Sequence, residues 1–282
     1  MSELVTEQPP AFAPRPVRRR RIGDTVRLIL RGVGQTLVTA GLVVLLFVVY
    51  EVWITNIFAH QAQHKVHTAL ENAWADGVDP LPGSGTSGIP IGAGIANIYI
   101  PRLGRDYAFT IVEGTGDASL TKGPGHYAGT ALPGQVGDFA VAGHRVGKGE
   151  PFLNLDHLKP GDTIIIETEK SWLVYSVLGD VAKADLSSPD VNGVPGREIV
   201  DPSDNAVILP IPNRPSAVPG TNDRYLTMTT CHPKFTAAQR MIVHAHLITT
   251  LPKVLGSAKS GHPTYVSPMP ASISNLYNQA GV

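Results

Sequence analysis

The stretch "LTMTTCHPKFTAAQRMIVHAHL", residues 226–247, contains the single cysteine of the chain, Cys231, and an arginine nine residues later, Arg240. A cysteine becomes a strong nucleophile when an acid/base partner stands beside it. A guanidinium offers a fork of donors that suits a developing oxyanion or a substrate carbonyl. The pattern therefore indicates nucleophilic catalysis at a carbonyl group. The alternatives are an inert, packed thiol and a solvated arginine at the end of a strand.

A thiol nucleophile needs a histidine as its acid/base companion, and the chain has ten of them. His144, in "DFAVAGHRVGKGEPF", ends an apolar run and precedes a turn-rich segment, so its ring can project at the rim of a sheet. His126 opens a loop and is the second candidate. His232 adjoins Cys231, but strand geometry points its side chain to the other face. We therefore predict His144 as the partner.

The elements that must position these residues read as strands. Eight short runs rich in Ile, Val, Tyr and Thr lie between residues 93 and 252: "IANIYIPRL", "DYAFTIVEG", "DFAVAGH", "DTIIIETE", "WLVYSVLGDVAKA", "NAVILPIP", "RYLTMTTC" and "RMIVHAHLITT". Eight strands in about 160 residues fit a closed or nearly closed barrel, because closure removes exposed strand edges. We predict a mainly β fold, an eight-stranded β-barrel with short helices over residues 93–252.

The last two runs should form a hairpin. A hairpin of this length can return Arg240 beside Cys231, although the sequence does not give the register. His244 and His246 share one face of the final run, where a satisfied or solvent-facing pair is favoured over a metal site.

Charge is distributed unevenly at the amino terminus. Residues 1–31 contain seven arginines against three acidic residues: Arg15, Arg18, Arg19, Arg20, Arg21, Arg27 and Arg31, with Glu3, Glu7 and Asp24. Residues 32–50 contain no charged residue and would span roughly 28 Å as a helix, close to the ~30 Å hydrocarbon core of a bilayer. Tyr50 and Trp53 follow, where amphipathic rings favour the headgroup layer.

This pattern predicts a transmembrane signal-anchor helix over residues 32–54. A cleavable signal peptide is the alternative, but its apolar region would be shorter, about 7–15 residues. The arginine bias places residues 1–31 in the cytoplasm as a basic tail and everything after residue 54 outside the cell membrane.

Residues 55–92 are expected to be an extracellular juxtamembrane segment and linker. The first part can form a helix with His60, His64 and His67 on one face. That spacing could bind a metal, but no carboxylate or cysteine completes the set, so we expect a solvated helix. The Gly/Pro/Ser-rich part has no reason to fold. Residues 253–282 lose all periodicity and are expected to be a flexible C-terminal tail.

Overall composition limits the class of function. The 282 residues carry 23 basic and 23 acidic side chains, so the chain has no basic footprint for nucleic acid. One cysteine excludes an intramolecular disulfide framework.

These residues together resemble a sortase, a membrane-bound cysteine transpeptidase of Gram-positive bacteria. The resemblance rests on "TMTTC" with an arginine nine positions on, on "AGHR" earlier in the chain and on the amino-terminal anchor, and it runs from about residue 95 to residue 250. The segment "KGPGHYAGTALPGQVGDFAVAGHR", residues 122–145, further resembles class E sortases of actinobacteria. In those proteins a tyrosine such as Tyr127 accompanies a preference for LAXTG over LPXTG signals. They commonly have Gly-Asn where this chain has Gly137-Asp138, which makes the local hydrogen bonding a question for the structure.

The resemblance implies the chemistry of the site. The Cys231 thiolate attacks the Thr–Gly carbonyl of a sorting signal, His144 protonates the leaving amine, and Arg240 stabilises the oxyanion. Tyr127 and Thr230 are the expected substrate-binding residues. With unperturbed pKa values of about 8.5 and 6.5, roughly 3 % of the thiol and 24 % of the imidazole carry the required charges at pH 7, so a slow enzyme is expected.

The resemblance also implies the partners. These are secreted proteins with C-terminal sorting signals, an acceptor amine from a peptidoglycan precursor or a pilin lysine, and the cytoplasmic membrane. No cofactor and no metal is expected. Calcium occurs in some sortases near the loop before the Cys strand, but the acidic residues of loop 187–224 are too scattered to indicate a site: Asp190, Glu198, Asp201, Asp204 and Asp223.

Two other functions fit parts of the pattern. An L,D-transpeptidase would share the location and the nucleophile, but its Ser-His-Gly-Cys type of motif is missing. A non-enzymatic anchored binding module would use Cys231 only for packing.

Overall fold

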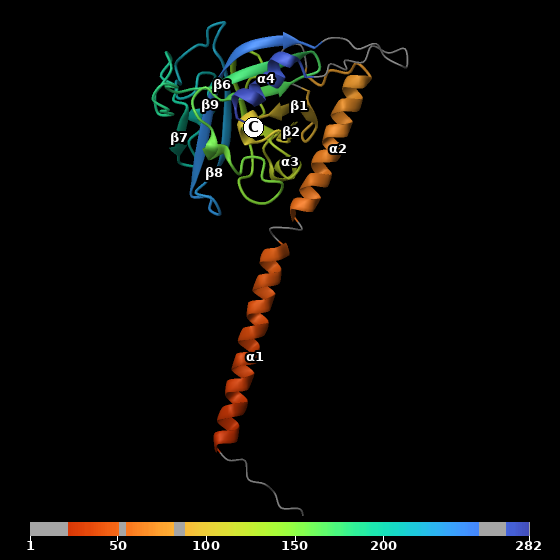
Figure 1. The fold of residues 1–282 in the computed structure, drawn as a ribbon, viewed down its shortest axis with the longest axis vertical. Coiled ribbons are helices and arrows are strands. Elements are labelled where there is room, and N and C mark those ends of the chain that lie inside the picture. Colours follow the sequence, from red (N-terminus) through yellow and green to blue (C-terminus); the bar gives the residue numbers. More distant parts are fainter. Residues whose placement is uncertain (1–21, 51–54, 82–87, 254–268, 282) are drawn as a thin grey trace, which may run out of the picture. The chain divides into compact units, whose positions relative to one another are not determined.

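The computed structural model describes residues 22–50, 55–81, 88–253 and 269–281 (Figure 1). The chain divides into two compact units, residues 1–49 and residues 50–282. The first contains helix α1, and the second contains a β-barrel with helices packed against it.

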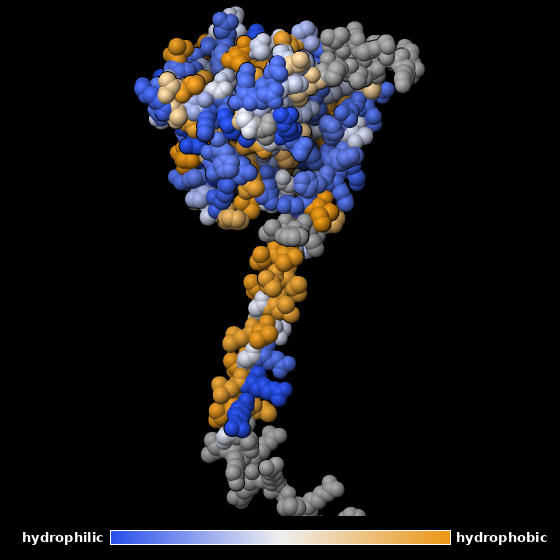
Figure 2. All heavy atoms as spheres, in the orientation of Figure 1, coloured by the Kyte–Doolittle hydropathy of each residue, from blue (hydrophilic) through white to orange (hydrophobic). Residues whose placement is uncertain are grey.

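Helix α1 spans Ile22–Val49, and its part Val26–Val49 is long and apolar enough to cross a membrane. In Figure 2 hydrophobic residues dominate the part of α1 that ends at Val49, and hydrophilic residues gather toward its start; none of the apolar stretch is buried inside the protein. A helical segment without charged residues, such as residues 32–49, is suited to a lipid environment. The helix begins ten residues before the predicted start of the anchor at residue 32, and it includes Arg27 and Arg31. Residues 1–21 and 51–54 of the predicted tail and anchor lie outside the described residues.

Eight strands form a closed ring in the order β6–β5–β1–β2–β3–β4–β8–β9, and a β9–β6 pairing closes it. Strand β7 also pairs with β9. The strands are β1 Gly94–Tyr99, β2 Ala108–Glu113, β3 Gly125–His126, β4 Gly137–Ala142, β5 Thr163–Glu167, β6 Ser171–Val177, β7 Arg197–Val200, β8 Arg224–His232 and β9 Gln239–Pro252. The predicted mainly β fold with an eight-stranded barrel is confirmed.

One of the eight predicted runs is wrong. "NAVILPIP", residues 205–212, is not a strand and contains the 3-10 turn η4, Ala206–Ile208. Its two prolines lack the backbone N–H groups that a ladder needs. The two-residue strand β3 takes its place in the ring, and β7 is a further strand that the sequence did not reveal, because both are shorter than a readable period.

Alternation along the strands decides which side chains face the core. The core side chains include Phe139 and Val141 of β4, Leu226 and Met228 of β8, and Met241, Val243 and Ala245 of β9. Successive residues of a strand point to opposite faces. Cys231 and Arg240 therefore lie on the outward face of the barrel, and Thr230 points inward.

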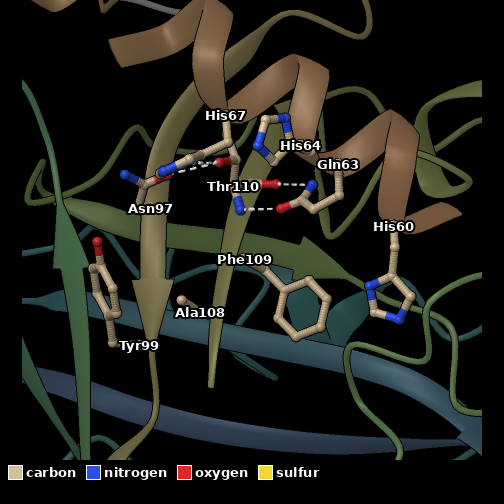
Figure 3. A pocket seen from close by; sticks show the side chains of 9 residues that line it. All are labelled: His60, Gln63, His64, His67, Asn97, Tyr99, Ala108, Phe109 and Thr110. Carbon is tan, nitrogen blue, oxygen red and sulfur yellow. Dashed lines mark hydrogen bonds between the residues drawn. The ribbon is translucent and has the colours of Figure 1, made fainter. Parts of the chain in front are cut away.

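Helix α2, Thr55–Ala75, packs along β1 and β2. The structure contains the helix expected here, but one face of it is buried, including Ala59, Leu70 and Trp74. Figure 3 shows two polar contacts that help to fix its position, between Gln63 and the backbone of Thr110 and between the His67 ring and Asn97. The helix is therefore docked rather than solvated.

The carboxyl-terminal residues differ from the expected flexible tail. Residues Ala271–Gln279 form helix α4, and Ile273 and Tyr277 are buried against β5 and β6. These two apolar side chains, four residues apart, cover Ile165, Trp172 and Val174 on the outer face of the sheet. Residues 254–268 lie outside the described part. The other short helices are η2 Pro101–Leu103, α3 Asp117–Leu120 and η3 Leu155–His157.

Candidate active site

The parallel pairing of β4 and β8 brings His144 and Cys231 to the same edge of the barrel. The last pair of this ladder is Ala142 with Thr229. The Gly143 N–H then donates to the Thr229 carbonyl at 3.0 Å, and the Thr230 hydroxyl donates to the Gly143 carbonyl at 2.8 Å. Because both strands run in the same direction, the next residues, His144 and Cys231, lie at the same end of the two strands.

The hairpin between β8 and β9 places Arg240 directly opposite Cys231. The hairpin therefore brings Arg240 back opposite Cys231, as expected from the sequence. Directly opposed residues of an antiparallel pair extend their side chains to the same face, with Cβ atoms about 4.5–5.5 Å apart. The Arg240 Nη1 group donates to the carbonyls of Ala237 and Gln239, at 3.2 and 3.1 Å. The guanidinium is therefore bound to the backbone of its own hairpin, at the strand position that pairs with Cys231.

A cavity of about 390 Å³ contains both the thiol and the histidine. Its lining residues are His144, Arg145, Val146, Cys231, Phe235, Thr236 and Ala237. Cys231 and His144 are both half-buried, so each is shielded by the protein and still reachable from the cavity. Both residues that the proposed chemistry needs therefore line one cavity.

His144 carries an unused hydrogen-bonding atom. Among the described residues, its buried Nε2 has no partner. Burial lowers the pKa of His144, the positive charge of Lys148 lowers it further, and the carboxylate of Asp117 acts in the opposite direction. Lys148 and Asp117 form an ion pair with each other. The ring is therefore mostly neutral at pH 7, with a free nitrogen in the neighbourhood of the cavity.

Arg145 is a site residue that the sequence analysis missed. It is only 4 % exposed, and its Nη1 lies 3.3 Å from the Cys231 carbonyl oxygen and 2.9 Å from Nδ1 of His232. Its Nη2 makes an ion pair with Asp156 at 3.2 Å. Arg145 therefore ties the backbone of Cys231 to the segment that carries His144. The only sequence signal was its place directly after the histidine in "AGHR".

The other candidate histidines are committed elsewhere. His126 is fully buried, with Nδ1 at 2.7 Å from Glu113 and Nε2 at 3.1 Å from the Ala131 carbonyl. His232 contacts Arg145. His244 is fully buried between Thr227 and Glu198, at 2.8 and 3.0 Å, and so is a satisfied core histidine. The second ring of the predicted pair, His246, packs edge-on against Tyr225 at a centroid distance of 5.3 Å.

The two expected substrate-binding residues lie in different surroundings. The Tyr127 hydroxyl is 2.9 Å from the Thr229 hydroxyl, on the same outward face of β8 as Cys231. Thr230 points inward, is 2 % exposed and uses its hydroxyl on Gly143. Its geometry fits a link between the His144 and Cys231 strands better than contact with a substrate.

Asp138, at the position where the resemblance leads one to expect an asparagine, is part of a buried network. It is 1 % exposed, and its Oδ1 accepts from the Thr227 hydroxyl at 2.8 Å. Burial raises the pKa of Asp138 well above its usual range, and the Thr227 bond offsets this only in part. The Thr227 bond is one that an asparagine side-chain oxygen could also accept.

The acidic residues of segment 187–224 bond to protein groups, and Glu198 contacts His244 of β9. Asp190 accepts from the Tyr225 hydroxyl, and Asp223 accepts from Asn192. Within the described ranges, no group of three or more His, Cys, Asp or Glu side chains is arranged to hold a metal ion.

Comparison with known proteins gives consistent matches. A family model described as "Sortase domain" matches residues 98–248. Sortase SrtE1 of Streptomyces coelicolor is 35 % identical over 251 residues, and Sortase SrtE2 of the same organism is 31 % identical over 244 residues. These matches cover 86 % and 82 % of this chain, and 64 % and 87 % of the two relatives. The solved SrtF sortase from Corynebacterium diphtheriae has a TM-score of 0.53 and 38 % identity, over 67 % of this chain and 99 % of that one.

Proposed function

Because this chain belongs to the sortase family, whose members are cysteine transpeptidases, we propose that it cleaves sorting signals at Cys231 and transfers the released protein to an amine. The observation that carries the proposal is one cavity that holds the thiol and the ring of His144, with Arg240 opposite the thiol. The family match favours this function over an L,D-transpeptidase or an anchored binding module.

The first half-reaction forms a thioester. The Cys231 thiolate attacks the carbonyl carbon between Thr and Gly, and the carbonyl oxygen takes the negative charge. A guanidinium has five N–H donors, so Arg240 retains donors for this oxyanion while Nη1 holds the hairpin. When the C–N bond breaks, the His144 imidazolium gives its proton to the leaving amine.

The second half-reaction releases the product. An acceptor amine attacks the thioester carbon, neutral His144 takes its proton, and the sulfur leaves as the thiolate of Cys231. The acceptor is a peptidoglycan precursor or a pilin lysine. The cycle returns both groups to their starting charges without any other reactant.

The fraction of enzyme in the reactive charge state limits the turnover rate. The active form needs a thiolate and an imidazolium together, and the lowered pKa of His144 makes the imidazolium scarcer at pH 7 than in a free histidine. We therefore expect a slow turnover, which is tolerable when enzyme and substrate share one membrane.

Signal choice is assigned to Tyr127. Alanine at the second position of LAXTG keeps a backbone N–H that proline in LPXTG lacks. The phenol stands beside Thr229, two residues from Cys231 on the same face, where it can accept that N–H directly or through water. The enzyme should therefore favour LAXTG signals.

The position in the cell follows from helix α1. We propose that it anchors the protein in the cytoplasmic membrane, with residues 1–31 inside and residues 55–282 outside, because the arginines lie on one side. Protease added to intact protoplasts should remove the barrel. A protected barrel would contradict this orientation.

A peptide assay tests the activity. The full chain, purified in detergent, is incubated with LAXTG or LPXTG peptides and with candidate amines. The expected result is cleavage between Thr and Gly and a product joined to the amine. No cleavage of either peptide would contradict the proposed function.

A further inference from the structure

The loop that follows His144 has an unusual backbone. Gly147, Lys148, Gly149 and Glu150 have φ angles of 68°, 52°, 83° and 49°, four left-handed residues in a row. Two of them are not glycine, and such residues rarely adopt this region. A backbone of this kind persists only where its surroundings hold it in place.

The first turn of helix α2 provides that hold. Asn56 donates from Nδ2 to Oε1 of Glu150 at 2.7 Å, and its Oδ1 accepts the Gly149 N–H at 3.0 Å. The helix also approaches the loop closely, because a Cβ added to Gly149 would lie 3.4 Å from the Cβ of Ala59. One side chain of α2 thus bonds to two of the four left-handed residues.

The position of Asn56 is itself fixed by contacts farther along the helix. The Gln63 amide pairs with both the N–H and the carbonyl of Thr110, as Figure 3 shows. The His67 ring lies 3.0 Å from the Thr110 hydroxyl. Residues 56, 63 and 67 are spaced by seven and four, so they share one helical face. Docking of α2 on β2 therefore sets where Asn56 meets the loop.

The loop transmits this position to the active site. The Phe152 N–H donates to the His144 carbonyl at 3.0 Å, which closes the loop on the histidine. The Tyr107 hydroxyl donates to the Pro151 carbonyl at 2.7 Å. With this side of the loop fixed, the Asn56 contacts determine where residues 147–150 lie relative to the imidazole.

We propose that Asn56 is a positioning residue for His144, so that helix α2 is a working part of the active site and not only a spacer. The inference rests on the proposed function. It also means that the residue supporting the loop lies only seven positions after Val49, the last residue of the apolar helix.

Asn56→Ala in the full chain tests the proposal. It removes two hydrogen bonds between residues that do not line the substrate cavity, so kcat should fall about three- to tenfold while KM stays the same. His64→Ala is the matched control, because His64 is exposed on the same helix, and it should leave both constants unchanged.

A charge-swapped pair separates positioning from general stability. Asn56→Asp places a carboxylate against Glu150 and should lower kcat at least as much as Asn56→Ala. The double variant Asn56→Asp with Glu150→Gln restores a donor and acceptor pair and should recover most of the wild-type kcat.

Three outcomes would count against the proposal: an unchanged kcat in Asn56→Ala, a loss that tracks the melting temperature alone, or no recovery in the double variant. A wild-type chain that cleaves no peptide would instead overturn the proposed function.

Discussion

Strands β4, β8 and β9 carry two polar clusters on the same outward face. At the ends of the strands, Cys231 and Arg240 are half-buried beside His144, whose Nε2 has no partner among the described residues. Farther along, Thr227 and His244 are fully buried and bonded to each other. Both clusters contain a hydroxyl or thiol and a histidine, and they differ in access and in satisfied hydrogen bonds.

The difference separates a chemical role from a structural one. In the inner cluster, burial raises the pKa of Glu198, but hydrogen bonds from His244 and Asn213 outweigh burial and lower it overall. The His244 proton that faces Glu198 is therefore held. At the strand ends, by contrast, the buried Nε2 of His144 has no hydrogen-bond partner among the described residues, so no structural bond commits it. Residue type alone does not mark the site.

The largest effect is expected when each of the two histidines is replaced by alanine in turn. His144→Ala should lower kcat/KM at least about 100-fold with little change in the melting temperature. His244→Ala should do the reverse, because it leaves the buried Thr227 and Glu198 without their partner. Peptide kinetics and thermal unfolding of both variants give the comparison. Near-normal cleavage by His144→Ala, with loss in His126→Ala, would move the acid role to His126.

Replacing Arg240, at the strand ends beside Cys231, should also cause a large loss of activity. Arg240→Ala should reduce kcat about 100-fold, the usual scale for loss of an oxyanion donor. Arg240→Lys keeps the positive charge but loses the paired N–H donors of the guanidinium, so its kcat should lie between those of the wild type and Arg240→Ala. Arg224, at the opposite end of β8, is the control, and Arg224→Ala should stay within about twofold of wild type. Equal losses in Arg240→Ala and Arg224→Ala would point to a general effect of charge.

The buried cluster should respond through stability. Asp138 has a raised pKa in the folded chain, so the unfolded chain binds fewer protons above about pH 4. Stability is therefore lost as pH rises toward the folded pKa. Asp138→Asn removes this loss and should raise the melting temperature at pH 8 more than at pH 4, with kcat unchanged.

Asp162 provides the contrast for that variant. It is buried but paired with Arg102 at 2.7 Å, so Asp162→Asn should lower the melting temperature. A destabilised Asp138→Asn at pH 8 would show that Asp138 is ionised in the fold.

How much of this site the sequence predicted depends on how local each feature is. A hairpin between the last two runs was enough to expect Arg240 near Cys231, whereas the parallel pairing of β4 with β8, which brings His144 to the same edge, could not be read from the sequence. The Arg145 contacts could not be predicted, because Asp156 and His232 come from distant elements. The same holds for Asn56, whose partners are about 90 residues away and depend on how α2 docks.

The barrel shows the same limit. Runs of five or more strand-forming residues identified seven strands correctly. β3 and β7 have no pattern of their own and exist because neighbouring strands supply partners. In helix α4, Ile273 and Tyr277 pack on apolar side chains of the sheet. The local sequence of the helix does not indicate this contact.

Tyr127 should produce the smallest effect. Loss of one hydrogen bond, about 0.5–1.5 kcal/mol, predicts a several-fold drop in the LAXTG to LPXTG ratio of kcat/KM in Tyr127→Phe. Thr229→Val removes the internal partner of the phenol and should keep the preference. If the LAXTG to LPXTG ratio of kcat/KM falls equally in both variants, Tyr127 acts by packing the loop. If the ratio is unchanged in Tyr127→Phe, the hydrogen-bond explanation is wrong.

The central claim is that Cys231 carries the acyl group, and intact mass spectrometry tests it most directly. The full chain is mixed with excess LAXTG peptide without an amine and quenched in acid within one turnover. We predict a mass increase equal to the peptide up to its threonine, located on Cys231 and removed by an added amine. Cys231→Ala should show neither adduct nor cleavage. Cleavage that persists in Cys231→Ala, or that proceeds in the wild type with the adduct on another residue, would contradict the account.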